Sequence, residues 1–177
     1  MKLVYKAALR APDHAWLRPS RFIQVTGDGI TKLSNISVNF AKEKLKEEDE
    51  QKLEKYKNAP FRAPMIIILV SHNQDHPKVP EIEQVMSTAA AAQNILLALK
   101  AFNFAGMWRT GAFSLNDDIT KYLGLDEDHK VLGYLYVGTP DGPDKKIPEL
   151  DLDDFIGLQF TTGPDLSLIH ISEPTRL

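Results

Sequence analysis

The chain has 177 residues, of which 43% are hydrophobic and 25% charged, and its formal net charge is -3. This composition is typical of one globular domain with a sizeable core. The slight acidic excess argues against a nucleic-acid-binding surface, which would show a basic excess. The absence of cysteine excludes disulfides, thiolate metal sites and cysteine nucleophiles. Nothing argues for secretion, so we expect a cytoplasmic protein.

The start of the chain predicts a helix followed by a strand. Apolar residues alternate with basic ones over residues 2–10, a pattern that predicts a short amphipathic helix ending before Pro12. Residues 21–26, RFIQVT, alternate enough to predict a strand. The Gly-Asp-Gly sequence at 27–29 predicts the turn that ends it.

A charged helical region and a strongly apolar strand come next. Residues 30–39 predict a weaker helix. The charged block 41–57 is expected to form a solvated helix or a mobile flap, because its apolar stripe is thin. Residues 65–71, MIIILVS, form the strongest strand pattern in the chain, and their continuous apolar run is typical of a strand covered on both faces.

Residues 85–104 predict a long helix around which the rest of the domain is arranged. The helix surface is apolar nearly all round, which predicts a position inside the core. Gln93, Asn94 and Lys100 interrupt the apolar run. A lysine in the apolar part of a membrane span is costly, so the segment is not expected to cross a membrane.

The second half predicts a short helix at 116–123 and a second strong strand at 130–137, KVLGYLYV. Residues 144–154 are rich in Pro and Asp and are expected to be extended, and residues 155–160 form a last apolar segment. Long helices among a few strong strands predict an α+β fold in which a central sheet is flanked by helices.

The chain contains no familiar catalytic motif of a protein nucleophile. Gly-x-Ser-x-Gly, the P-loop, Gly-x-Gly-x-x-Gly and His-Glu-x-x-His are all absent. His72 and His76 have the spacing of a metal-binding pair on a helix, with Asp75 beside them. Pro77 and the loop composition argue against a helix there, so we assign no metal site and no catalytic side chain.

Two arginine-containing stretches remain as candidates for a binding site. Arg10 lies at the end of a predicted helix, with His14 four residues later. Trp108-Arg109-Thr110 follows the long helix and is flanked by glycines. Structural roles stay open for both, since arginines at helix ends often cap carbonyls and Trp108 can be partly core. Together they favour a site for an anionic, aromatic cofactor that performs the reaction, because arginine grips phosphate and aromatic rings stack on a flat ring.

Seven short runs, collinear over residues 2 to 160, resemble the flavin-dependent nitroreductase family, in particular its compact single-domain NAD(P)H nitroreductases. Each run is weak alone, and the set in order is specific. The runs are Arg10-Ala-Pro-Asp-His14, Arg18-Pro-Ser-Arg-Phe22, Ala59-Pro-Phe-Arg-Ala-Pro64, Lys78-Val-Pro80 with Glu83-Gln84, Gln93-Asn94, Met107-Trp-Arg-Thr-Gly111, and Lys130-Val131 continuing to Gly133-Tyr-Leu-Tyr-Val-Gly-Thr-Pro140.

The resemblance implies an α+β, nitroreductase-like fold with a central mixed sheet flanked by helices and a long buried core helix. It implies a homodimer with one FMN at each end of the interface. NADH or NADPH would reduce the flavin, and the flavin would reduce a nitro-aromatic, quinone or similar small-molecule acceptor in a ping-pong cycle. No nucleic-acid or membrane partner is implied.

The resemblance also assigns site residues. Arg10 and His14 would reach the FMN of the partner subunit, and Trp108, Arg109 and Thr110 would line the flavin in their own subunit. The end of the long helix matches the family segment for the nicotinamide nucleotide, namely Ala98, Leu99, Lys100, Ala101, Phe102 and Asn103.

The match also sets expected domain limits. Family members begin with a helix that ends in an Arg-Arg-Ser-type motif for the flavin phosphate, and the match here begins with the second helix, so we expect an N-terminally truncated domain over residues 1–160. Residues 161–177 lie beyond the match. Their end, LSLIHISEPTRL, is typical of translated adapter or vector sequence, so we assign 161–177 to a non-native tail.

Two alternatives to this enzyme function stay open. A truncated chain without the N-terminal motif would act as a non-catalytic flavin-binding or dimerisation module. A relative with the same fold would act on a different acceptor, as a dehalogenase or a flavin-modifying enzyme does.

Overall fold

The computed structural model describes residues 1–143 and 146–156. The chain divides into two compact units, Met1–Pro140 and Asp141–Leu177. The first unit is built on one four-stranded sheet whose strand order is β1-β2-β4-β3. The strands are β1 (Ser20–Thr26), β2 (Met65–His72), β3 (Ala105–Arg109) and β4 (His129–Gly138).

Strand β2 lies in the middle of the sheet and is covered on both faces, as its apolar run predicted. Ile67 and Leu69 belong to one core cluster, whereas Ile66, Ile68 and Val70 belong to a second. All five side chains are buried. Successive side chains of a strand point to opposite faces, so this single run fills two cores at once.

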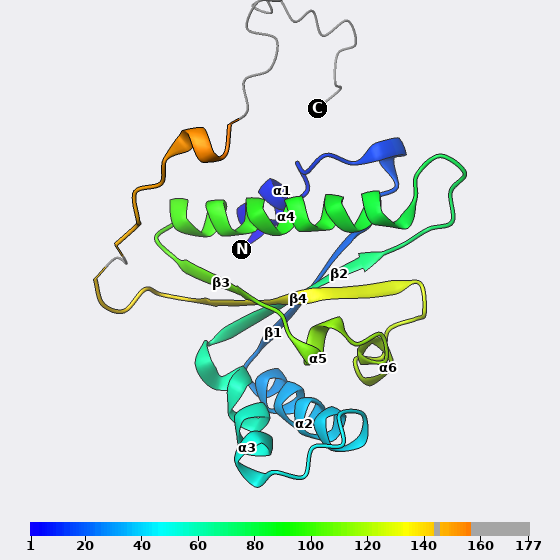
Figure 1. Ribbon diagram of the computed structural model, residues 1–177, viewed down its shortest axis with the longest axis vertical. Helices are drawn as coiled ribbons and strands as arrows, with labels where there is room; N and C mark the ends of the chain where they lie inside the picture. Colours follow the sequence, from blue (N-terminus) through cyan, green and yellow to red (C-terminus); the bar gives the residue numbers. More distant parts are fainter. Residues whose placement is uncertain (144–145, 157–177) are drawn as a thin grey trace, which may run out of the picture. The chain divides into compact units, whose positions relative to one another are not determined.

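Helices cover the two faces of the sheet (Figure 1). One face is covered by α1 and α4, which pack on each other and on the strands. The other is covered by α2, α5 and α6, and α3 packs on α2. Their bounds are α1 (Lys2–Ala8), α2 (Asp28–Glu43), α3 (Glu50–Asn58), α4 (Glu81–Ala101), α5 (Ala112–Leu115) and α6 (Ile119–Tyr122). The three-residue helix η1 (His14–Trp16) and η2 (Ala59–Arg62) lie in the connections. The α+β prediction is confirmed.

The sheet is antiparallel at every ladder of the described chain, and the expected mixed sheet is wrong in this respect. The chain leaves the sheet at the end of β1, passes through α2 and α3, and returns at the same end of the sheet, where Thr26 pairs with Met65. Strand β2 therefore runs opposite to β1. Helix α4 then leads from β2 to β3, and β4 inserts between these two strands. The parallel pair β2 and β3 therefore never shares a ladder.

Helix α4 is buried on one side, not all round, so the expected position inside the core holds only in part. Its inner face, which includes Ala91, Ala92, Ile95 and Leu99, is inaccessible to solvent. Ile82, Met86 and Leu97 lie on the opposite side and are each 61% exposed. The helix is apolar on both sides, but the described residues of the first unit supply packing partners for only one of them.

A bulge at Gly133 re-aims the side chains of β4. Leu69 pairs with Gly133 and Val70 pairs with Val131, so Leu132 is the additional residue on β4. Leu132 and Leu135 point to the α4 side, whereas Tyr134 points to the α2 side. Without the additional residue, Leu132 and Tyr134 would share a face. The bulge therefore brings Tyr134 to the face that holds the cavity lined by Arg109 and Phe113.

Several element boundaries differ from the sequence expectation. Only Gly27 forms the turn after β1, with φ at 53°, and Asp28 already opens α2. Helix α2 extends to Glu43 and takes the first residues of the charged block, because Phe40 and Ala41 complete its buried face. The rest of the block forms α3, which begins after Asp49 because the carboxylate of Asp49 accepts the backbone N–H of residue 51 at 2.8 Å.

The second unit is described from 141 to 143 and from 146 to 156. Its one described element is the short helix η3 (Leu152–Asp154), where an extended segment was expected. Residues 157–160 and the tail 161–177 lie outside the described residues. The predicted domain limit at residue 160 therefore stays a prediction, although the first compact unit ends at Pro140.

Candidate functional site

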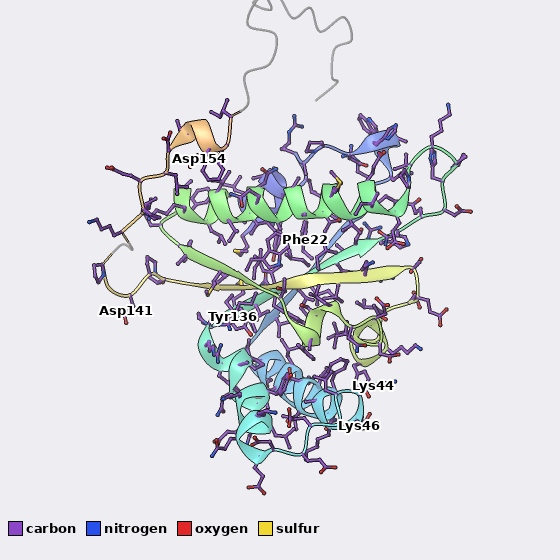
Figure 2. The ribbon with its side chains drawn as sticks, in the orientation of Figure 1. Phe22, Lys44, Lys46, Tyr136, Asp141 and Asp154 are labelled. Carbon is purple, nitrogen blue, oxygen red and sulfur yellow. The ribbon has the colours of Figure 1, made fainter. Side chains whose placement is uncertain are left out.

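A cavity of about 450 Å³ lies on the face of the sheet that carries α2, α3 and α5. Figure 2 labels Tyr136 on this face and Phe22 on the face toward α4. The cavity brings together segments far apart in sequence: the end of β3, the following α5, the middle of β4, and the helices before β2. Its lining includes Ser37, Tyr56, Arg62, Arg109, Thr110, Phe113, Tyr134 and Tyr136.

Aromatic rings form one wall of this cavity. Phe113 and Tyr134 stack with ring centroids 5.1 Å apart and planes inclined by 13°. Tyr134 is buried, and its hydroxyl makes no hydrogen bond to the described protein atoms. Burial raises the pKa of Tyr134, and the nearby Tyr136 adds to the effect. The wall is thus flat and apolar, as a planar heteroaromatic ring would require, and it contains one buried hydroxyl without a described protein partner.

Cationic side chains form the rim of the cavity. Lys52, Lys55, Arg62 and Arg109 line it against one carboxylate, Glu47, which pairs with Lys52 at 3.2 Å. Burial raises the pKa of the Tyr136 phenol, and the charges of Arg109 and Arg62 oppose that rise. Both guanidinium groups therefore act on the same pocket. Two arginines beside an aromatic wall suit a ligand that carries a phosphate or carboxylate.

The predicted trio at the end of β3 is divided between the two faces of the sheet. Arg109 and Thr110 line the cavity. Trp108 lies on the α4 face, where it packs on the core and its indole N–H donates to the Leu132 carbonyl at 3.2 Å. Adjacent residues of a strand point in opposite directions, so the side chains of Trp108 and Arg109 cannot contact one ligand from the same side.

Arg10 and His14 lie in the connection between α1 and β1. His14 Nδ1 is 2.7 Å from Glu83 Oε2 in the first turn of α4, and both side chains are largely exposed. Ala15, Trp16 and Arg18 all have positive φ values between 51° and 58°. Such backbone costs on the order of 1–3 kcal/mol per residue and gathers at ligand-binding segments. This strain singles out the His14 segment as a candidate for function.

The predicted nucleotide segment 98–103 ends α4 and forms the turn after it. Leu99 is fully buried, so its side chain serves the core. Phe102 is 48% exposed, and Asn103 adopts a left-handed backbone with φ at 60°. Glu83, which contacts His14, lies sixteen residues before Leu99 on the same helix, and this separation is about 24 Å along the helix axis. Within one chain the helix therefore separates His14 from the segment 98–103.

Arg62, Tyr134 and Tyr136 line the cavity but were not predicted as site residues. Arg62 belongs to η2, and the two tyrosines follow the bulge in β4. The glycine at position 133, inside the strand pattern of residues 130–137, was a usable signal. A glycine inside a strand indicates a bulge or a close approach of another part of the chain. The pattern alone could not say which face the tyrosines would occupy.

Tyr134 should make the protein less stable in alkali. Below about pH 10 its phenol is neutral in both states; above that pH the unfolded chain releases the proton, while burial keeps the folded phenol neutral. Stability therefore falls as pH rises, by up to about 1.4 kcal/mol per pH unit for one such group. In urea unfolding at about pH 8 and about pH 11, Tyr134→Phe is expected to lose less stability than the parent. Tyr56→Phe is the control, and equal losses in Tyr134→Phe and the parent would contradict the prediction.

Comparison with known proteins assigns the class of protein that this fold and site define. The family model described as "Nitroreductase family" matches residues 1–139. The chain belongs to the nitroreductase family, and it is an oxidoreductase of that class. The match covers almost all of the first compact unit, from α1 to the end of β4.

Individual relatives agree with this assignment. The protein named "Putative NAD(P)H nitroreductase YdjA" of Escherichia coli strain K12 is 36% identical over 137 residues, which cover 77% of this chain and 74% of the relative. A nitroreductase-like family protein of Bacillus cereus superposes with a TM-score of 0.75 at 18% identity, covering 90% of this chain and 83% of that one. The nitroreductase NfnB from sphigopyxis sp. strain HMH, described as FMN and NADPH-dependent, superposes with a TM-score of 0.65 at 18% identity over 89% and 87%. These last two likenesses establish the fold. Among the helices described, none has the length and apolarity to cross a membrane.

Proposed function

We propose that the protein is an FMN-dependent NAD(P)H oxidoreductase that reduces nitro-aromatic, quinone or similar small acceptors. One observation carries the proposal: in a member of the nitroreductase family, Arg109 and Thr110 line a cavity that also holds a second arginine and a wall of stacked aromatic rings. Relatives named as NAD(P)H nitroreductases support the choice of reductant. The name of NfnB supports the choice of flavin.

The residues of the cavity fit FMN in charge and shape. Arg62 and Arg109 supply the donors that a phosphate or a flavin carbonyl accepts. The stacked Phe113 and Tyr134 supply a flat apolar surface, and the Tyr134 hydroxyl can donate or accept one hydrogen bond. Thr110 offers a hydroxyl and a backbone N–H at the cavity edge. Together they form a set that grips an anion and orients a ring.

When bound, FMN supplies a ring that takes a hydride from the nicotinamide and gives electrons to the acceptor. The protein then needs no nucleophile of its own, which agrees with the absence of nucleophile motifs from the sequence. The arginines hold the cofactor and stabilise negative charge near it. The aromatic wall keeps water away from one face of the site. Lys100, Ala101, Phe102 and Asn103 are the exposed members of the 98–103 segment and would be accessible to the nicotinamide nucleotide.

A homodimer would complete this site. The outer face of α4 presents Ile82, Met86 and Leu97, and an exposed apolar stripe of this kind marks an interaction surface. Two copies crossing through this stripe in opposite directions would bring the partner's His14 segment toward residues 98–103. The separation of these two segments along one helix therefore supports a site shared between subunits.

Leu97→Glu tests the dimer. A carboxylate placed in an apolar interface costs several kcal/mol, so the dimer dissociation constant should rise by more than about 100-fold. Sedimentation velocity over a range of protein concentrations measures this change. The control is Gln51→Glu, which adds the same charge on exposed α3. An unchanged dimer in Leu97→Glu would remove α4 from the interface, and a monomeric parent would overturn the dimer itself.

The activity is tested by the flavin spectrum. The purified protein is mixed with FMN, unbound flavin is removed, and the visible spectrum is recorded before and after anaerobic addition of NADPH. We expect retained flavin absorbance that bleaches on reduction and recovers when a nitro-aromatic or a quinone is added. Absence of retained flavin, or retained flavin that NADPH does not bleach, would contradict the proposed function.

A further inference from the structure

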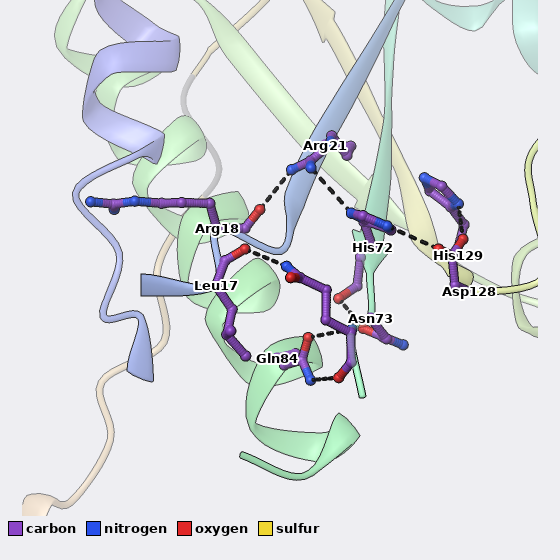
Figure 3. A network of polar contacts seen from close by, with 10 residues as sticks. Leu17, Arg18, Arg21, His72, Asn73, Gln84, Asp128 and His129 are labelled. Atoms are coloured by element: carbon purple, nitrogen blue, oxygen red, sulfur yellow. Dashed lines mark hydrogen bonds and ion pairs between the residues drawn. The ribbon is translucent and has the colours of Figure 1, made fainter. Parts of the chain in front are cut away.

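The open ends of β2 and β4 bring two histidines and an aspartate together, away from the cavity described above. His72 ends β2 and His129 begins β4, and the two residues are direct cross-strand partners. His72 Nε2 is 2.9 Å from Asp128 Oδ2, and His129 Nδ1 is 2.6 Å from Asp128 Oδ1. The carboxylate thus lies between two imidazoles, as Figure 3 shows.

The three side chains offer a suitable ligand set for a divalent transition metal. One ligand atom from each lies within 4.8 Å of the others. Zinc bonded to imidazole nitrogen or carboxylate oxygen at about 2.0–2.1 Å places its tetrahedral ligands about 3.4 Å apart. No pair of ligand atoms therefore needs to close by more than about 1.4 Å, and the contacts to Asp128 at 2.9 Å and 2.6 Å would lengthen. The two imidazoles stack at 4.7 Å between centroids, so binding would rotate them out of the stack toward the shared ion.

The contact between His129 and Asp128 is one that a cation would improve. His129 Nδ1 is buried and makes no hydrogen bond with a described atom, although it lies only 2.6 Å from Asp128 Oδ1. The distance suits an ion pair, but the direction does not suit a shared proton. A lone pair beside a carboxylate oxygen is repulsive unless a positive charge lies between them. A metal ion supplies that charge, and nitrogen and oxygen ligands suit zinc and its neighbours.

The surroundings attract cations. His129 and Asp128 line a cavity of about 660 Å³ between the β2–α4 connection, α6 and the start of β4. This cavity carries six carboxylate side chains and two lysines. The acidic members are Asp75, Glu81, Asp117, Asp118, Glu127 and Asp128. An acidic concave surface raises the local concentration of divalent cations and gives water access to the remaining coordination positions.

We propose that His72, Asp128 and His129 bind a divalent transition-metal ion of the zinc class, with water from the acidic cavity completing its coordination. The ion would join the ends of β2 and β4, two neighbouring strands of the sheet. The site is independent of the flavin, since none of its three ligands lines the cavity that holds Arg109.

Arg21 competes with the ion for His72. Its guanidinium Nη2 lies 3.1 Å from His72 Nδ1, and a guanidinium only donates, so Nδ1 accepts and Nε2 carries the proton. A metal on Nε2 moves that proton to Nδ1, where it faces the guanidinium. Arg21 must therefore turn away, while the carbonyls of Arg18 and Ser20, which accept from its Nη1, remain as partners. Removing the competitor should strengthen metal binding.

Calorimetric titration with zinc chloride tests the site on EDTA-treated full-length protein. We expect one ion per chain. Loss of a residue that only hydrogen-bonds to a metal ligand lowers metal affinity by about 10–100-fold. Loss of a ligand itself, in His72→Ala or His129→Ala, should therefore weaken binding by more than about 100-fold. The matched control is His76→Ala, because His76 lines the same cavity without belonging to the cluster. Binding that survives both ligand substitutions, or that is lost equally in His76→Ala, would overturn the assignment.

Arg21→Gln is expected to change zinc affinity in the opposite direction. Glutamine can accept the Nδ1 proton of the metal-bound ring, so zinc should bind about tenfold more tightly than to the parent. Imidazole nitrogen NMR gives an independent measurement: the Nε2 signal of His72 and the Nδ1 signal of His129 should shift with zinc, while those of His14 and His76 stay in place. No zinc-dependent shift at His72 and His129, or weaker binding in Arg21→Gln, would contradict the proposal.

Discussion

Gly133→Ala is expected to destabilise the folded protein by at least about 3 kcal/mol, since overpacking, lost packing and backbone strain add at this position. A Cβ at Gly133 would lie 2.3 Å from Trp108 Nε1 and 2.7 Å from the Arg109 carbonyl. The backbone there has φ at +143°, which side chains rarely adopt. Moving the indole away would also break its hydrogen bond to the Leu132 carbonyl.

Urea unfolding followed by circular dichroism measures this effect, and a soluble fraction too small to measure would be its extreme form. The control is Gly138→Ala in the same strand, whose added Cβ meets Pro64 at 3.3 Å and has no positive φ to strain. We expect that control to change the free energy of unfolding by less than about 1 kcal/mol. If both alanine variants were equally stable, the bulge would tolerate a side chain and our account of β4 would be wrong.

Arg109→Ala is expected to raise the dissociation constant for FMN by about 10- to 150-fold. Losing a charge-assisted hydrogen bond costs on the order of 1.5–3 kcal/mol, which converts to that factor. Arg109 pairs with Tyr134 through the backbone of β3, and alanine keeps that ladder. The melting temperature of the flavin-free protein should therefore stay near the parent value. Fluorescence quenching of titrated FMN measures the affinity.

Two further variants separate charge from geometry at this position. Arg109→Lys keeps the charge but loses the planar fork, so its FMN affinity should fall between those of the parent and the alanine variant. Lys42→Ala removes a positive charge from the exposed side of α2, outside the cavity, and should leave affinity unchanged. Parent-like FMN affinity in Arg109→Ala would make this side chain structural and would overturn the site proposed here.

The effects expected of Gly133→Ala and Arg109→Ala both involve one short segment of β3. Trp108 covers Gly133 on one face of the sheet, and Arg109 enters the cavity on the other. The tryptophan thus supports the strand that carries the arginine, although the two were expected to contact the same ligand. The division follows from the alternation of side chains along a strand, which a motif written as a continuous string does not show.

No sequence motif indicates the long-range contacts of the proposed metal site either. His72 and His76 have the local spacing of a metal-binding pair, but Pro77 disfavours the helix that this spacing would need. In the fold, His72 instead meets His129, which is 57 residues away, through the register of β2 and β4. The ladder places the two rings face to face, and no local pattern encodes which residues of two strands will pair.

The amino-acid sequence by itself determined the elements whose burial is local in origin. The apolar run 65–71 specified a strand covered on both faces, the run 130–137 a second strand, and residues 85–104 most of α4, because hydrophobic periodicity is visible within one segment. The family and the α+β class were also accessible from the sequence. Only the tertiary structure decided the all-antiparallel strand order, the exposed side of α4, and the face on which Arg109, Tyr134 and Tyr136 meet. These features depend on where each connection returns the chain to the sheet, on the bulge at Gly133 and on the register of the paired strands. All three arise from contacts between segments many residues apart.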